Sequence, residues 1–287
     1  MGPMPSYSLE MPRALVIRTA GTNCDGEMVR AFELAGAKAE LVHLDRLIEE
    51  PQRLEDFDLF GFPGGFSYGD DIASGRVFAM KIRERLYPAL RQAVIRGCPM
   101  IGACNGFQVL VQVGLLPGPA PGEPWPEHEP PAQTVALTDN QDARFHDRWV
   151  GVAFEDSVCL WTRGLNEEMD PATARAVRQL PVAHGEGRLI ASSPAVISDM
   201  ERAGQVVLRY TDNYNGSQAA IAGICDASGR ILGLMPHPER YLDWTRHPFW
   251  TRLDSSIRKG TTPGLRMFIN AVEAVRAAGR APARQLA

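Results

Sequence analysis

The segment from Gly102 to Gln108 (Gly-Ala-Cys-Asn-Gly-Phe-Gln) has the residue types of a cysteine nucleophile on a sharp turn. An apolar strand pattern ends in small residues, a cysteine follows, and a helix pattern begins directly after it, as in a nucleophile elbow. Glycines at 102 and 106 permit a tight turn and close packing of the strand against the helix. At a helix N-terminus the dipole and the free N–H groups favour a thiolate. We therefore predict that Cys104 is a nucleophile and not a buried structural cysteine.

A cysteine nucleophile needs a base, and the base needs a group that orients it. Two His-x-Glu pairs offer both, namely His184 with Glu186 and His237 with Glu239. In an extended segment, residues two apart lie on the same side, so each carboxylate can lie beside its own imidazole. The second pair directly follows an apolar strand pattern and is stiffened by two prolines, which makes it the better candidate. The first pair lies in a glycine-flanked loop, and we expect it to line the site or to contact a partner.

An oxyanion that develops during acyl transfer needs backbone N–H donors. The N–H of Asn105 directly follows the predicted nucleophile and can face such a charge. A glycine pair at the end of another strand pattern, in the segment 63–70, can expose the N–H of Gly65 or Phe66 toward the sulfur. This segment lacks the Gly-Lys-Ser/Thr ending and the Gly-x-Gly-x-x-Gly spacing of nucleotide-binding loops, so an oxyanion hole is the favoured interpretation.

The elements that must position these residues alternate between strand and helix. We expect strands at 14–18, 39–43, 58–62 and 99–103, separated by helices that end at Gly36, extend over about 77–96, and cover about 105–113. This alternation predicts an α/β fold with a flavodoxin-like, doubly wound, mostly parallel sheet. Strand patterns that follow one another closely predict added antiparallel strands at 135–137, 149–153, 158–161, 188–191, 206–210, 221–224 and 231–235.

No segment of the sequence marks a boundary to a second domain. We expect a single domain over residues 13–278, an N-terminal extension over 1–12 and a frayed tail over 279–287. A proline-rich insertion lies near 117–132, because seven prolines fall among the sixteen residues from Leu116 to Pro131.

Composition excludes several classes of protein. The 287 residues are 45% hydrophobic and 22% charged, as in ordinary globular proteins. A net charge of −4 lacks the basic footprint of a nucleic-acid binder, and no apolar run reaches the roughly 18 residues of a membrane span. Residues 1–12 lack the features of a signal peptide. The five cysteines are widely spaced and odd in number, which predicts reduced thiols in the cytoplasm and no metal site.

Seven segments, taken in order, resemble the class I glutamine amidotransferases. Within that family they are most similar to the glutaminase subunits of the phosphoribosylformylglycinamidine synthases, which act in purine biosynthesis. The resemblance covers roughly residues 13–116 and 134–260. The segments are Gly21–Asp25, Gly64–Asp70, Gly102–Gln108, Ala183–Gly187, Asn215–Ser217, Ile221–Ile224 and Met235–Arg240.

The resemblance implies a role for each candidate residue. Cys104 would attack the carboxamide carbon of glutamine, His237 would act as general base and acid, and Glu239 would orient His237. The remaining residues would serve the oxyanion hole (Asn105 with Gly65 or Phe66) and substrate binding (Gln108, with His184 and Glu186 at the rim).

The resemblance also implies a partner. The chain is too short to include a synthetase and has no recognisable ATP site, so we expect no cofactor in it. The ammonia would pass to a separate synthetase subunit that uses ATP and Mg²⁺ to convert formylglycinamide ribonucleotide to formylglycinamidine ribonucleotide. A small accessory subunit is a further expected partner. Because a free glutaminase would waste glutamine, we expect the partner to switch the site on, through the Gly64–Asp70 loop.

Three other interpretations remain open at this point. The chain could be another cysteine hydrolase of the same fold, such as a peptidase or a thiol-dependent deglycase, since one fold hosts many chemistries. It could be a catalytically silent interaction subunit, although the cysteine, histidine and glutamate are all present. A redox pair of Cys98 and Cys104 is disfavoured, because six residues of strand hold their Cα atoms farther apart than the roughly 7 Å that a disulfide permits.

Overall fold

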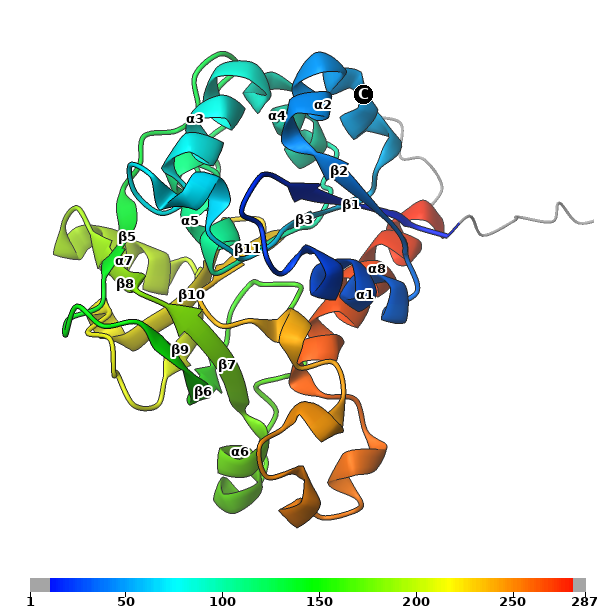
Figure 1. Cartoon of the computed structure of the whole chain (residues 1–287), viewed down its shortest axis with the longest axis vertical. Coiled ribbons are helices and arrows are strands. Elements are labelled where there is room, and N and C mark those ends of the chain that lie inside the picture. Colours follow the sequence, from blue (N-terminus) through cyan, green and yellow to red (C-terminus); the bar gives the residue numbers. More distant parts are fainter. Residues whose placement is uncertain (1–10, 281–287) are drawn as a thin grey trace, which may run out of the picture.

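A nine-stranded sheet runs through the molecule (Figure 1). The computed structural model describes residues 11–280. The strand order in the sheet is β2-β1-β3-β4-β11-β10-β9-β6-β7, and β5 pairs with β8 in a separate two-stranded sheet. The strands are β1 (Arg13–Arg18), β2 (Lys38–His43), β3 (Leu59–Phe62), β4 (Met100–Ala103), β5 (Val135–Asp139), β6 (His146–Phe154), β7 (Gln179–His184), β8 (Glu186–Ala191), β9 (Val206–Tyr210), β10 (Ile221–Cys225) and β11 (Ile231–Leu234).

The sheet has a parallel half and an antiparallel half. The strands β2, β1, β3, β4 and β11 pair in parallel, in the strand order of the flavodoxin-like fold. From β11 onward, β10, β9, β6 and β7 each pair antiparallel with their neighbour. The predicted α/β fold with added antiparallel strands is confirmed.

Helices cover both faces of the parallel half, as the strand residues require. In β1, Ala14 and Val16 point to one face and Leu15 and Ile17 to the other, and all four are fully buried. The first pair packs with α1 and α8, and the second with α3, α4 and α5. The helices are α1 (Asp25–Leu34), α2 (Leu44–Glu49), α3 (Arg76–Arg85), α4 (Tyr87–Ile95), α5 (Asn105–Val113), α6 (Pro171–Val177), α7 (Pro194–Arg202) and α8 (Pro263–Arg280).

Some expected elements differ from the structure. The single helix expected over 77–96 is two helices that break at Leu86, because Pro88 lacks an N–H and lies in the first turn of α4. The strand expected over 158–161 is wrong. These residues form a bend and the start of a turn, in which the N–H of Leu160 donates to the carbonyl of Gly229 at 2.9 Å. Cys159, Leu160 and Trp161 are buried, whereas Val158 is exposed. The strand β7 was not expected, because Pro181 interrupts its pattern.

The proline-rich insertion is an extended loop over α4. The described chain forms neither helix nor strand between Val113 and Val135. The insertion is held by Tyr87, whose hydroxyl donates to the carbonyl of Pro126 at 2.9 Å, and by Arg91, which donates to the carbonyl of Trp125 at 3.0 Å.

The ends of the predicted domain stay predictions. The extension over 1–12 and the tail over 279–287 fall mostly outside the described residues. Among the helices of the described part, none is long and apolar enough to cross a membrane.

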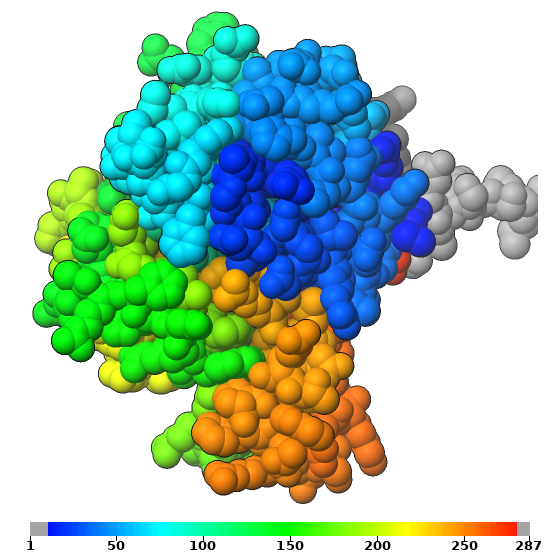
Figure 2. Space-filling view, viewed as in Figure 1, coloured from blue at the N-terminus to red at the C-terminus, as the bar shows by residue number. Residues whose placement is uncertain are grey.

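The carboxyl ends of the parallel strands meet at one edge of the sheet. Ala103 at the end of β4 pairs with Leu234 at the end of β11, and Phe62 at the end of β3 pairs with Gly102. The loops that follow β1, β3, β4 and β11 therefore converge. In Figure 2 the dark blue, cyan and orange surfaces that follow β1, β3 and β11 adjoin on one face. Ligand sites of open α/β sheets lie at this edge.

Candidate active site

Cys104 occupies a strained turn between β4 and α5. Its backbone angles are φ 52° and ψ −109°, a conformation that non-glycine residues rarely adopt. The N–H of Cys104 donates to the carbonyl of Leu234 at 2.9 Å, which ties the turn to β11. The side chain is 6% exposed, at the N-terminus of α5. This is the geometry of a nucleophile elbow, in which strain holds the reactive atom clear of the backbone.

The two glycines of this turn are required by close packing. A Cβ on Gly102 would lie 2.6 Å from the carbonyl oxygen of Gly106, and a Cβ on Gly106 would overlap the carbonyl of Phe62. No larger residue fits at either position without moving backbone. The close approach of strand and helix that the sequence predicts is therefore confirmed.

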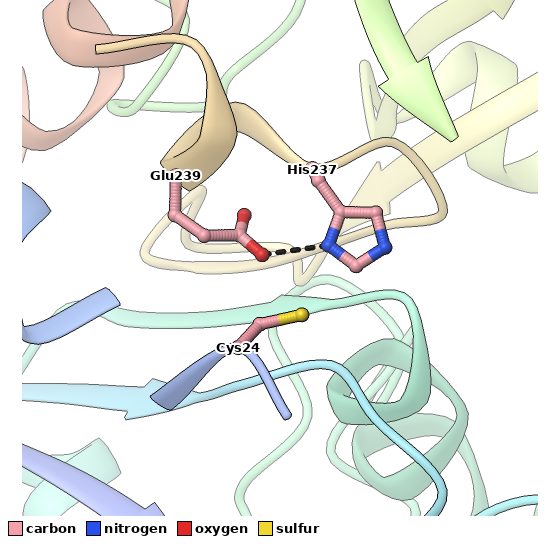
Figure 3. Close-up of side chains that lie close together, drawn as sticks. All are labelled: Cys24, His237 and Glu239. Atoms are coloured by element: carbon pink, nitrogen blue, oxygen red, sulfur yellow. Dashed lines mark hydrogen bonds and ion pairs between the residues drawn. The ribbon is translucent and has the colours of Figure 1, made fainter. Parts of the chain in front are cut away.

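His237 and Glu239 form a buried pair directly after β11 (Figure 3). The imidazole Nδ1 and the carboxylate Oε1 lie 2.7 Å apart, and both residues are 1% exposed. The N–H of His237 donates to the carbonyl of Pro181 at 2.8 Å, which fixes the backbone. Burial lowers the pKa of His237, but the Glu239 carboxylate and then Cys104 outweigh it, so the pKa lies well above its usual range. The other ring nitrogen, Nε2, has no partner among the described residues.

Cys104 and His237 lie beside the same point of the loop after β3. A Cβ built on Gly64 would be 2.6 Å from Cε1 of His237 and 3.3 Å from Cβ of Cys104. The glycine leaves the space in which the thiol-bearing carbon and the imidazole approach each other. Cys104, His237 and Glu239 are thus brought together from β4 and β11, as the sequence predicts.

The backbone N–H groups expected to bind an oxyanion differ in whether they already donate to another acceptor. Asn105 begins α5, where an N–H has no acceptor within its own helix. Gly65 has φ 146°, which favours glycine, and it bridges to Thr22. The N–H of Phe66 already donates to the carbonyl of Gly21 at 2.9 Å. The expectation that Phe66 supplies a free N–H is therefore corrected, and Asn105 and Gly65 remain the candidates.

Gln108 joins two parts of the site through its amide. Its Oε1 accepts from Nδ2 of Asn105 at 3.0 Å, and its Nε2 donates to the carbonyl of Glu186 at 2.6 Å. The first turn of α5 is thereby tied to the start of β8. A direct contact of Gln108 or Glu186 with substrate stays a prediction.

His184 is buried next to Cys104. The Sγ of Cys104 lies 3.5 Å from the carbonyl oxygen of Ala183, and Nε2 of His184 lies 2.7 Å from the hydroxyl of Tyr214. Burial is the main cause that lowers the pKa of His184 to about 3, and the charge of the nearby His237 adds to it. His184 is therefore neutral at physiological pH, and a role in substrate binding stays a prediction.

Two residues near the reacting groups were not predicted from the sequence. Cys24, at the start of α1, accepts a hydrogen bond from Nη2 of Arg240 at 3.0 Å. Its Sγ lies within 4.8 Å of a ring nitrogen of His237 and a carboxylate oxygen of Glu239. The available signal was the position of Cys24, which follows a strand end as the other candidates do.

The same three groups could be considered as metal ligands, because thiolate, imidazole and carboxylate are the ligands of zinc. However, Nδ1 of His237 and Oε1 of Glu239 are 2.7 Å apart, a hydrogen-bond distance that leaves a proton between them. The guanidinium of Arg240 already places a cation against the sulfur of Cys24. The donor geometry therefore suits a hydrogen-bonded site better than a metal site.

Comparison with known proteins assigns the family. A model of the CobB/CobQ-like glutamine amidotransferase domain matches residues 11–275. The phosphoribosylformylglycinamidine synthase subunit PurQ of Dehalococcoides mccartyi is 41% identical over 273 residues, 91% of this chain and 96% of that protein. The PurQ of Methanococcus maripaludis is 37% identical over 284 residues, 92% and 97% of the two chains.

A solved structure agrees with these relatives. The structure of PurLQS from Thermotoga maritima has a chain that matches with a TM-score of 0.65 and 31% identity, over 92% of this chain and 99% of that chain. With matches of this length and identity, the chain belongs to the glutamine amidotransferase family and, within it, to the PurQ subunits of phosphoribosylformylglycinamidine synthase.

Proposed function

We propose that this chain is the glutaminase component of phosphoribosylformylglycinamidine synthase and that Cys104, His237 and Glu239 perform the reaction. The observation that carries the proposal is the strained elbow of Cys104 beside the buried His237–Glu239 pair. A silent interaction subunit would have no need of a strained cysteine or of a buried charged pair, both of which cost stability.

The first half of the reaction forms a thioester. The thiol proton of Cys104 rests on His237, whose raised pKa favours the imidazolium, and the thiolate sulfur attacks the carboxamide carbon of glutamine. The oxyanion is stabilised by the N–H groups of Asn105 and Gly65. His237 then protonates the leaving nitrogen, and ammonia departs from the γ-glutamyl thioester. Glu239 supports this step because its carboxylate stabilises the imidazolium that forms.

The second half releases glutamate. His237 takes a proton from water, the resulting hydroxide attacks the thioester carbon, and the C–S bond breaks. The proton returns to the sulfur, which restores Cys104 and His237. No cofactor is needed for these steps, because a thiol, an imidazole and water account for every bond formed and broken.

The ammonia goes to a separate synthetase subunit, which uses ATP and Mg²⁺ to convert formylglycinamide ribonucleotide to formylglycinamidine ribonucleotide. The PurLQS complex of Thermotoga maritima supports assembly with two kinds of partner, which we assign as the synthetase and a small accessory subunit. We place the reaction in the cytoplasm, where reduced thiols such as the five free cysteines persist.

We also propose that the partner activates the glutaminase through the Gly64–Asp70 loop. Phe66 in this loop is 50% exposed and stacks on Phe145 with ring centroids 6.2 Å apart. Ile72 is 69% exposed just beyond it. Exposed apolar side chains in such positions suit a contact with a partner. Because Phe66 directly follows Gly65, a movement of this loop would also move the N–H of Gly65. Equal rates of glutamine hydrolysis with and without the synthetase would refute this activation.

The proposed reaction is tested by separating the two ammonia sources. The chain and the synthetase are mixed with ATP and formylglycinamide ribonucleotide, and formylglycinamidine ribonucleotide is measured with glutamine or with ammonium chloride. We expect Cys104→Ala to abolish the glutamine-dependent reaction and to leave the ammonia-dependent reaction unchanged. Glutamine-dependent product at the wild-type rate from Cys104→Ala would refute the proposal.

A further inference from the structure

Cys24 is fixed between the loop after β1 and the loop after β3. The N–H groups of Asn23 and Cys24 both donate to the carbonyl of Gly64 at 3.1 Å. The side chain of Cys24 is 1% exposed. Its sulfur points toward Glu239 and His237, as Figure 3 shows. The proposed mechanism gives this sulfur no role, although it lies within 4.8 Å of a ring nitrogen of His237 and a carboxylate oxygen of Glu239.

Arg240 provides the second observation. It follows Glu239 in the same short turn, is half-buried, and its Nη2 lies 3.0 Å from Sγ of Cys24. Burial lowers the pKa of Arg240, but Cys24 and then Glu239 outweigh it, so the group stays charged. The sulfur of Cys24 therefore holds the positive charge of Arg240 next to the His237–Glu239 pair.

The third observation is the second carboxylate oxygen of Glu239. This Oε2 is buried and has no partner among the described residues. Arginine ordinarily binds a nearby carboxylate with two parallel hydrogen bonds. No ion pair between Arg240 and Glu239 exists in the described part of the chain, because Arg240 is bound to Cys24 instead. A direct pair would compete with His237 for the carboxylate.

We propose that Cys24 is a positioning residue of the glutaminase site: its sulfur holds the guanidinium of Arg240 away from Glu239, so that the carboxylate remains bound to His237. This inference rests on the proposed function. With the guanidinium bound to the sulfur, the carboxylate keeps the orientation that the imidazole needs.

The test compares three variants in the complex with the synthetase. Cys24→Ala removes the sulfur and frees Arg240 to pair with Glu239. We expect its kcat for glutamine hydrolysis to fall about 10- to 100-fold while KM stays within about twofold, since an orientation is lost and no substrate contact is. Cys24→Ser keeps an acceptor for Arg240 and should retain most of the activity. Adding Arg240→Met to Cys24→Ala removes the competing cation and should restore most of the lost kcat.

A matched control separates positioning from folding. Cys98→Ala removes the same atoms from another buried cysteine, whose sulfur faces the carbonyl of Phe57, and should leave kcat unchanged. The ammonia-dependent reaction and urea unfolding verify that each variant is folded and assembled.

The experiments distinguish a failure of this inference from a failure of the proposed function. A wild-type chain that does not hydrolyse glutamine would refute the function itself. An active wild type with a Cys24→Ala variant of equal kcat, or with no recovery in the double variant, would overturn only the role of Cys24. Inhibition of the wild type by added zinc that Cys24→Ser relieves would also overturn it, by identifying the sulfur as a metal ligand.

Discussion

A single methyl group at Gly64 should disable the site without unfolding the protein. A Cβ at this position would lie 2.6 Å from Cε1 of His237 and 3.3 Å from Cβ of Cys104. Carbon atoms pack best at about 3.5–4.0 Å, so the imidazole must move by about 1 Å. It cannot turn freely, because its Nδ1 is bound to Glu239 at 2.7 Å. The Gly64→Ala substitution therefore separates the base from the nucleophile.

The size of the effect follows from this displacement. A misplacement of about 1 Å in a reacting group costs up to roughly 100-fold in rate, which is about 2.7 kcal/mol in the barrier. We expect kcat for glutamine hydrolysis to fall by about that factor in the Gly64→Ala complex, with a smaller change in KM. Steady-state kinetics of glutamate release measure both.

A second glycine serves as the control. A Cβ on Gly26, in the first turn of α1, would find no atom within 4 Å, so Gly26→Ala should retain wild-type kcat. Urea unfolding of both variants verifies that the fold is intact. If Gly64→Ala hydrolysed glutamine as fast as the wild type, the packing of base and nucleophile inferred here would be wrong.

Two further predictions concern charge. Glu239→Gln keeps the shape of the side chain but not its charge, and it should lower the kcat of glutamine hydrolysis by about 100- to 10,000-fold while ammonia-dependent synthesis continues; a loss below tenfold would argue against a role for the carboxylate. The pKa of His184 is about 3 in the folded protein, whereas its ordinary value is 6.5. Between these two pH values the unfolded state binds one more proton than the folded state, so the free energy of unfolding falls as the pH falls. From pH 6.5 to about 4.5 this group should remove about 2.3 kcal/mol from the free energy of unfolding. Urea titrations should show a flatter pH dependence for His184→Gln, and an unchanged slope would contradict the burial of a neutral imidazole.

The proximity of the proposed reacting residues could be predicted because each follows an apolar strand pattern. Cys104 follows β4 and His237 follows β11, and parallel strands bring their carboxyl ends to one edge. Glycines that frame a cysteine, and a glutamate two residues after a histidine, are local patterns with a direct geometric meaning. The sequence alone therefore predicts the nucleophile, the base and the orienting group.

The remaining features depend on contacts between distant segments. The N–H of Phe66 is taken by Gly21, a pairing that no local pattern of the loop encodes. The bond between Arg240 and Cys24 joins residues 216 positions apart. The stretch 158–161 has a strand composition, yet it lies in a turn, from which Cys159, Leu160 and Trp161 pack into the core without a partner strand. Tertiary packing decides each of these.

Covalent labelling tests most directly whether Cys104 is the nucleophile. The complex is treated with the glutamine analogue diazo-oxo-norleucine, and the adduct is located by mass spectrometry. We expect one modified cysteine, Cys104. Glutamine should protect it from modification, and a Cys104→Ala variant should carry no adduct. A glutamine-protected adduct on another cysteine, or wild-type glutamine hydrolysis by a chain without Cys104, would contradict it.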